Sequence, residues 1–203
     1  EPITSTLNKS GARPIPVFLF TDEYGRERSA TRHINAEHEC RMCHNAGAGF
    51  VLGFEPNQLN RSAILPPGIY APDQLDFLFE KKVIASRPKI PKDNPGQLVD
   101  PHDMKQTLDD RARSYLHGNC SSCHHPGGNA IVSFFLRRDL PFDQLKTNKG
   151  TGIGTFGIKN AKIIVPGDPY RSILLYRMSK LGYGRMPYIG SKDVDIPAVS
   201  LIK

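Results

Sequence analysis

Hydrophobic and polar positions alternate with helical spacing in two parts of the chain, 73–83 and 168–182. Two more helices are expected, one at 107–117 from its capping residue and one that begins near Pro197. Residues with side chains that cap helices begin three of these stretches: Asp73, Thr107 and Asp168. The helix at 107–117 ends near Gly118 and leads directly to Cys120. We therefore predict helices in all four stretches.

The segments between these helices are rich in turn-forming residues, because the chain has 18 Gly and 17 Pro. The first 35 residues are polar, with at most one strand around 17–20. Residues 131–136 and 162–165 have strand-like sequences around a turn at 159–160, which predicts a small β-hairpin. Residues 86–103 are the most linker-like part. We expect a mainly α fold with long Gly/Pro-rich loops, divided into a first region with an extended N-terminal lead-in at 1–100 and a second domain at 101–203.

Composition limits the function classes. Hydrophobic residues make up 38% of the chain and charged residues 23%, as in globular proteins, and no apolar run is long enough to cross a membrane. The formal net charge is +7, yet no Lys/Arg run exceeds two residues, so the basic tract of a nucleic-acid-binding arm is absent. We expect no nucleic-acid partner and no transmembrane segment, and a basic surface suited to an acidic protein partner.

All four cysteines belong to two copies of one motif, Cys-x-x-Cys-His. The copies are Cys40-Arg-Met-Cys43-His44 and Cys120-Ser-Ser-Cys123-His124. Two thiols at this spacing add across the two vinyl groups of one haem, and the following His places its imidazole on the iron. Chance predicts roughly 0.003 such matches in a chain of this composition. The motifs therefore predict two covalently bound c-type haems, with His44 and His124 as metal ligands.

Three other uses of the cysteines stay open. A thioredoxin-like redox pair uses Cys-x-x-Cys, but it does not explain the following His in both copies. Four thiolates could form one structural zinc site, although 80 residues separate the two pairs. Each motif could also close on itself as a structural disulfide.

The sixth iron ligand decides between electron transfer and substrate chemistry. For the second haem we expect Met186, because it lies in a loop bounded by glycines and next to a proline. Met178 lies on an apolar helix face and is expected to fill the core. For the first haem we favour His33, seven residues before Cys40. The other candidates are His102 and Met104 in the linker; His38 lies too close to Cys40, and His117 and His125 are expected to form surface hydrogen bonds.

At this point the sequence resembles a known family. Residues 107–203 are similar to a class I cytochrome c domain: a helix, the second Cys motif, Pro126-Gly-Gly, a helix after Gly167-Asp-Pro, and Arg185-Met-Pro. The resemblance implies a cytochrome c-like haem domain in which His124 and Met186 bind the iron. The segments around both Cys motifs also resemble dihaem cytochrome domains that accompany bacterial sugar-dehydrogenase-type proteins. The first haem region departs from the family, since residues 45–106 hold no Met-Pro loop.

The functional prediction is a dihaem cytochrome c that carries single electrons between redox partners. The ends at Glu1 and Lys203 favour a domain or subunit of a larger dehydrogenase, which is compatible with this prediction. The alternative is a dihaem peroxidase-type enzyme with one open haem iron. Covalent haem attachment needs a ligation system on the export side of the membrane, so we expect a periplasmic or otherwise exported protein.

Overall fold

The computed structural model describes residues 10–203 except 22–23, 66–67, 92–93, 95 and 152–153. Most of the described chain is loop, as its Gly and Pro content predicts. The strands are β1 (Ala12–Thr21), β2 (Glu27–Ile34), β3 (Ala63–Leu65) and β4 (Ile69–Ala71). The α-helices are α1 (Glu37–Cys40), α2 (Pro56–Leu59), α3 (Gln74–Glu80), α4 (Leu108–Cys120), α5 (Ile173–Met178) and α6 (Ile196–Ile202).

The expectation of a mainly α, cytochrome c-like fold is wrong. Two antiparallel hairpins, β1–β2 and β3–β4, stand beside helices that are four to seven residues long except for the 13-residue α4. The β1–β2 hairpin has irregular register near Pro16, and its turn passes through Gly25 with a φ of 76°. The described chain is therefore a small α/β arrangement joined by loops.

The predicted hairpin between 131–136 and 162–165 is also wrong. Both segments are described, and neither contains a strand; Lys162 forms only an isolated bridge with Ser172. The reason is visible in the hydrogen bonds of 131–136. Backbone N–H groups there donate to separate loops, from Phe135 to the Leu145 carbonyl at 2.8 Å and from Leu136 to the His124 carbonyl at 2.8 Å. The apolar alternation thus belongs to an extended segment without a partner strand.

The helix starts follow the capping residues. Asp73 accepts hydrogen bonds from the backbone N–H groups of Leu75 and Asp76, and Thr107 accepts one from Asp110. The helix predicted near Pro197 is α6, capped by Asp195. The stretch 168–182 is less regular than predicted, because a 3₁₀ turn at Pro169–Arg171 precedes the short α5.

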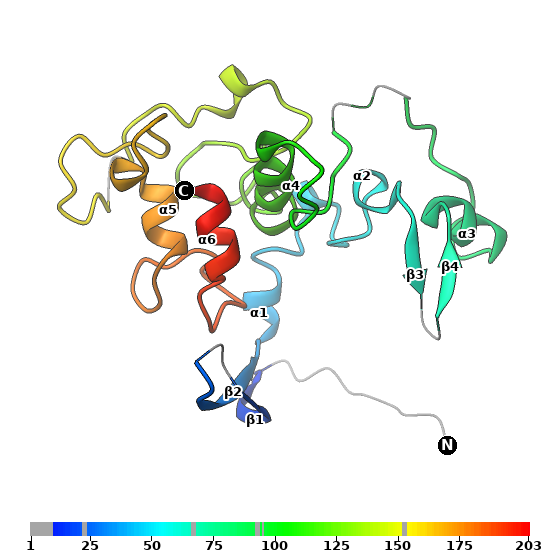
Figure 1. Cartoon of the computed structure of the whole chain (residues 1–203), viewed down its shortest axis with the longest axis horizontal. Helices are drawn as coiled ribbons and strands as arrows, with labels where there is room; N and C mark the ends of the chain where they lie inside the picture. Colours follow the sequence, from blue (N-terminus) through cyan, green and yellow to red (C-terminus); the bar gives the residue numbers. More distant parts are fainter. Residues whose placement is uncertain (1–9, 22–23, 66–67, 92–93, 95, 152–153) are drawn as a thin grey trace.

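The hydrophobic core lies beside α4. Four buried residues form its centre: Leu116, Leu136, Ile163 and Leu174. Figure 1 shows α5 and α6 on one side of α4, with α2, α3 and the β3–β4 hairpin on the other. Met178 packs against this core, as its helical spacing predicted, and so does Cys120. The second Cys motif therefore begins against this hydrophobic core.

The 86–103 segment contains no helix or strand among its described residues, but it is packed. Leu98 is buried, and its N–H donates to the Asn57 carbonyl at 3.0 Å. Next to it, the Val99 N–H donates to Ser114 Oγ on α4 at 3.0 Å. The segment thus contacts both the α2 region and the helix that leads to the second motif. No helix in the described part of the chain is long and apolar enough to span a membrane.

Candidate haem-attachment site

The two Cys motifs fold into the same backbone turn. Helices α1 and α4 end at the first cysteine of each motif. In the first motif the N–H groups of Cys43 and His44 donate to the Cys40 carbonyl at 3.2 and 2.9 Å. In the second motif the matching distances, to the Cys120 carbonyl, are also 3.2 and 2.9 Å. The intervening residues are Arg-Met in one copy and Ser-Ser in the other, so the turn does not depend on them.

The two turns lie against each other although 80 residues separate them. Cys43 Sγ and Cys123 Sγ are 3.8 Å apart, and Cys123 Sγ is 3.7 Å from the Met42 carbonyl oxygen. Close packing continues after the motifs: a Cβ added to Gly47 would lie 2.7 Å from the His125 ring. Sequence spacing gave no signal of this contact, because it depends on long-range packing.

The four cysteines are free thiols, and two of them, Cys43 and Cys120, have raised pKa values. Burial, followed by the neighbouring Cys123, raises the pKa of Cys43 to about 11. Burial likewise raises the pKa of Cys120 to about 12, with a smaller effect of Cys123. A thioredoxin-like pair requires a thiol with a lowered pKa. Within the described residues there is also no group of three or more Cys, His, Asp or Glu side chains placed to hold a metal ion. The raised pKa values of Cys43 and Cys120 weigh against a thioredoxin-like use of these two thiols.

The imidazole of His44 has the hydrogen bond that is typical of a metal-ligating histidine. Its Nδ1 lies 2.6 Å from the Phe50 carbonyl oxygen, so Nδ1 carries the proton and donates. This assignment leaves the lone pair on Nε2 of an exposed residue. Phe50 reaches this position with a φ of 61°, in the left-handed region. His44 is thus oriented by the loop that follows its own motif.

The environment of His124 is more enclosed. Its ring stacks on Phe134 with a centroid distance of 4.1 Å, and its Nδ1 is buried without a hydrogen-bond partner. Burial lowers the pKa of His124 to about 4, with the Phe134 backbone opposing this shift. The imidazole is therefore neutral, the form that binds iron. The sequence gave no role to Phe134; the apolar spacing of 132, 134 and 136 is the available signal.

The expectation for His117 and His125 is wrong, since both are buried. His117 Nδ1 accepts from the Arg138 N–H at 2.9 Å, so its Nε2 is the donor to Glu55 Oε2 at 2.9 Å. This histidine therefore joins the α2 region, α4 and the 136–140 segment. His125 Nδ1 lies 2.9 Å from the Pro126 carbonyl oxygen.

The residues predicted as sixth iron ligands lie in different parts of the fold. Met186 lies in the loop after α5, where its N–H donates to the Arg177 carbonyl at 3.0 Å, and its side chain is 38% exposed. His33 lies on β2, but its side chain is outside the described residues. The side chains of His102 and Met104 are exposed.

The residues around the first motif fit a haem. Large apolar side chains lie exposed immediately beside it, although such groups are usually buried. Phe50 is 61% exposed and Val51 63%; Met42 and Phe54 are also exposed. A flat apolar group bound at Cys40 and Cys43 would cover such surface. Together with the cysteines and the imidazoles of His44 and His124, these residues form a donor set that fits c-type haem.

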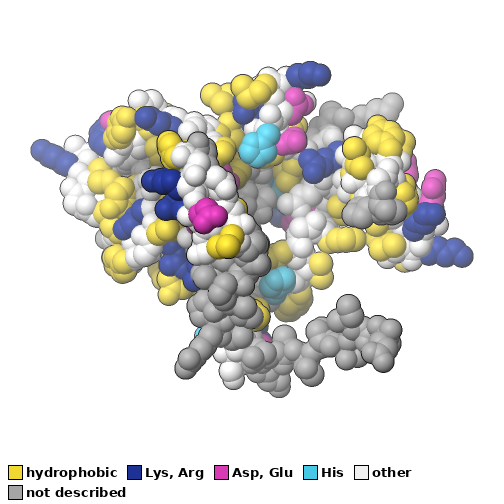
Figure 2. Space-filling view, turned by 60° about the horizontal axis from the view of Figure 1, so that its bottom comes forward, with side chains coloured by type: hydrophobic (Ala, Val, Ile, Leu, Met, Phe, Trp, Pro, Cys, Tyr) yellow, Lys and Arg dark blue, Asp and Glu magenta, His cyan; other side chains and the backbone are white. Residues whose placement is uncertain are grey.

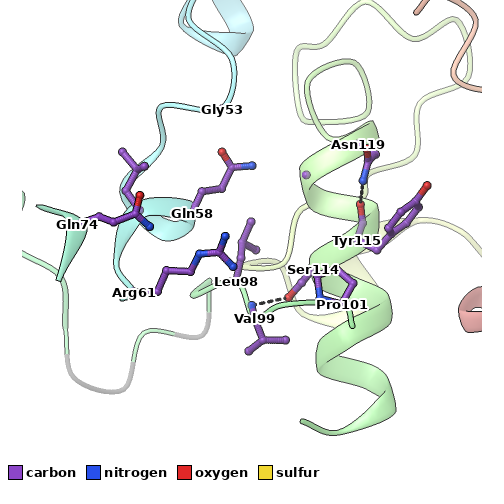
Figure 3. A pocket seen from close by; sticks show the side chains of 12 residues that line it. Gly53, Gln58, Arg61, Gln74, Leu98, Val99, Pro101, Ser114, Tyr115 and Asn119 are labelled. Atoms are coloured by element: carbon purple, nitrogen blue, oxygen red, sulfur yellow. Dashed lines mark hydrogen bonds between the residues drawn. The ribbon is translucent and has the colours of Figure 1, made fainter. Parts of the chain in front are cut away.

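A cleft of about 310 Å³ lies between the α2 region and α4. Figure 3 shows Gln58, Arg61 and Gln74 on one wall and Tyr115 and Asn119 of α4 on the other. Apolar residues such as Leu98, Val99 and Pro101 complete the lining, which includes none of the motif cysteines or histidines. We therefore do not assign this cleft to a haem.

Comparison with known proteins gives no independent identification. No protein-family model, no curated protein and no solved structure matches this chain. The functional argument therefore stands on the residues and geometry of this chain alone.

Proposed function

We propose that this chain is a dihaem electron-transfer protein of the c type. Cys40 and Cys43 anchor one haem through thioether bonds, and Cys120 and Cys123 anchor the other. The observation that carries the proposal is the pair of identical Cys-x-x-Cys-His turns, with Cys43 and Cys123 sulfurs 3.8 Å apart. Two groups attached at points that lie side by side in space are suited to passing electrons between them.

A haem supplies one-electron chemistry through its iron when bound. The chain's own residues provide attachment, ligation and shielding. His44 and His124 are the proposed proximal ligands; Phe134 covers the His124 ring and keeps water from it. Met186 is the proposed sixth ligand at the second site, and the Arg177 carbonyl fixes the backbone of its loop. His33 stays the proposed sixth ligand at the first.

The distribution of charge supports an acidic redox partner. Residues 131–203 contain 12 Lys and Arg against 5 Asp and Glu, whereas residues 1–130 contain 15 of each, so the whole net charge of +7 lies in 131–203. Figure 2 shows Lys and Arg side chains gathered on the part of the molecule at the left of the view. Arg177 and Lys180 lie over the Phe156 ring at 4.8 and 5.1 Å. Such a surface attracts acidic proteins and loses that attraction in salt.

The proposal also includes a cellular compartment and an electron donor. Covalent haem attachment places the protein in the periplasm or another exported compartment. Electrons would come from a dehydrogenase, with this chain as its electron-accepting domain or subunit.

The test is a count of covalent haem by intact mass on the purified full chain, with absorption spectra of the oxidised and reduced forms. Two covalent haems, both low-spin, support the proposal. In Met186→Ala we expect the Met–iron charge-transfer band to disappear while both haems stay attached; Met178→Ala is the matched control and should keep the band.

Two outcomes contradict the proposal. A haem-free chain from cells that contain the ligation system would refute it. A high-spin haem that binds cyanide would instead identify an open iron and favour the dihaem peroxidase alternative.

A further inference from the structure

The contact between Cys43 and Cys123 is a contact between two free thiols. Their sulfurs are 3.8 Å apart, close to van der Waals contact, while a disulfide bond is about 2.05 Å long. The sulfurs therefore need to approach by less than about 2 Å to bond.

Packing on both sides of the motifs holds this contact together. Gly47, three residues after the first motif, lies close to His125. A Cβ added to Gly47 would be 2.7 Å from the His125 ring and 3.3 Å from the Gly127 carbonyl oxygen. Farther along, the hydrogen bond from His117 to Glu55 joins α4 to the region that follows the first motif. The thiol contact is thus accompanied by other contacts between these regions.

We propose that, before haem is attached, Cys43 and Cys123 form a disulfide that links the two motifs. The oxidant is a small-molecule disulfide. One protein thiolate attacks it, forms a mixed disulfide and releases one small thiol; the second protein thiolate then displaces the other. Two protein thiols are oxidised to one disulfide, and one small disulfide is reduced to two thiols, which take up the two protons.

The link would act on haem loading, and this consequence rests on the proposed function. Each haem needs two thiols, and the disulfide removes one thiol from each motif. Both motifs are then blocked together, and a single reduction step releases both. A disulfide within one motif would block only that motif.

A Cys43–Cys123 disulfide would also show that the two motifs are in contact in the folded chain. In an unfolded chain, closing a loop of 80 residues is less favourable than closing one of 3 by a factor on the order of 100. Random oxidation therefore favours Cys40–Cys43 and Cys120–Cys123. A dominant Cys43–Cys123 product requires the geometry described above.

The experiment oxidises the full chain, produced without haem, with oxidised glutathione at about pH 8, where thiolates form more readily. Remaining thiols are then alkylated, and the chain is cut with trypsin. Cleavage after Arg41 separates Cys40 from Cys43, so links from these two cysteines differ in mass, while Cys120 and Cys123 stay on one peptide. We expect the 42–61 peptide joined to the 114–137 peptide as the major product. Major links within each motif would overturn the proposal.

Four single variants locate the bond. Cys43→Ser and Cys123→Ser should lose the cross-motif link, while the matched controls Cys40→Ser and Cys120→Ser should keep it. Equal loss in all four would overturn the assignment.

A glycine pair tests whether packing creates the contact. Gly47→Ala introduces a Cβ against His125 and should lower the yield of the link several-fold. Gly150→Ala is the control, because nothing lies within 4 Å of its added Cβ, and it should leave the yield unchanged. Unchanged yield in Gly47→Ala would contradict the packing argument.

The two proposals fail separately. A cross-linked chain that never takes up haem would refute the dihaem function and leave the disulfide standing. A chain that loads two haems but forms only links within each motif would refute the disulfide alone.

Discussion

The two Cys motifs share one backbone turn but have different surroundings. The first follows α1, a four-residue helix without a buried residue, and its His44 is exposed. The second follows the 13-residue α4, whose buried face includes Leu116 and His117. The comparison separates two tasks: the motif itself defines the attachment chemistry, whereas the surrounding packing defines stability and solvent access.

The difference predicts that the second motif is stabilised by the protein and that the first depends more on the haem. Phe134 already covers His124, while the apolar side chains beside the first motif lie in solvent. Substitutions near the second motif should therefore affect the folding of the chain most.

The largest expected effect comes from the core of α4. Leu116→Ala removes a side chain that is 8% exposed and should lower the free energy of unfolding by about 3 kcal/mol. Ile64→Ala, on β3, removes one that is 77% exposed and should change it by no more than about 0.5 kcal/mol. Urea unfolding of both variants measures this difference. Equal losses would show that the two regions are packed alike.

A smaller effect is expected at the hydrogen bond between Glu55 and His117, which joins the segment after the first motif to α4. Glu55→Gln replaces the carboxylate that accepts from buried His117 and should cost about 1.5 kcal/mol. The matched control Glu37→Gln breaks the exposed ion pair with Arg41 and should cost about 0.5 kcal/mol or less. If Glu37→Gln lowered the free energy of unfolding as much as Glu55→Gln does, the Glu55–His117 hydrogen bond would have no special importance for stability.

The same residue predicts a pH dependence. The hydrogen bond from His117 holds the pKa of Glu55 below its ordinary value of 4.5. Because the folded-state pKa is lowered, this stabilisation is present above pH 4.5 and is lost as the pH falls through the folded-state pKa. Glu55→Gln should therefore show a smaller loss of stability in acid than the wild type. If the stability of the wild type and of Glu55→Gln fell equally with pH, apart from a constant difference, the lowered pKa of Glu55 would not contribute to acid unfolding.

The smallest effect tests the cap of the helix that leads to the second motif. Thr107→Ala removes the acceptor for the Asp110 N–H and should cost about 1 kcal/mol. Thr107→Ser keeps a hydroxyl acceptor and should restore most of this loss. A serine variant as unstable as the alanine variant would mean that the methyl group, rather than the cap, matters.

The sequence predicted local features well and distant ones poorly. The caps at Asp73 and Thr107 were predictable because their hydrogen bonds join residues two or three positions apart. The hairpin expected between 131–136 and 162–165 is not formed. Strand-like alternation also occurs where an extended segment forms hydrogen bonds to loops, so the pattern alone did not identify a strand. His117 was misplaced on the surface because its partners, Glu55 and Arg138, are 62 and 21 residues away.

The candidate site shows the same division. The turn of each motif follows from its residues, but the approach of Cys43 to Cys123 depends on packing across 80 residues. Local periodicity carries no information about such a contact.

The most direct test of the account is a peptide map of the purified, haem-loaded full chain. After proteolysis, mass spectrometry should find one haem on the peptide with Cys40 and Cys43 and one on the peptide with Cys120 and Cys123. Unmodified cysteines, or haem on only one of the two motifs, would contradict the claim that these paired turns hold two haems.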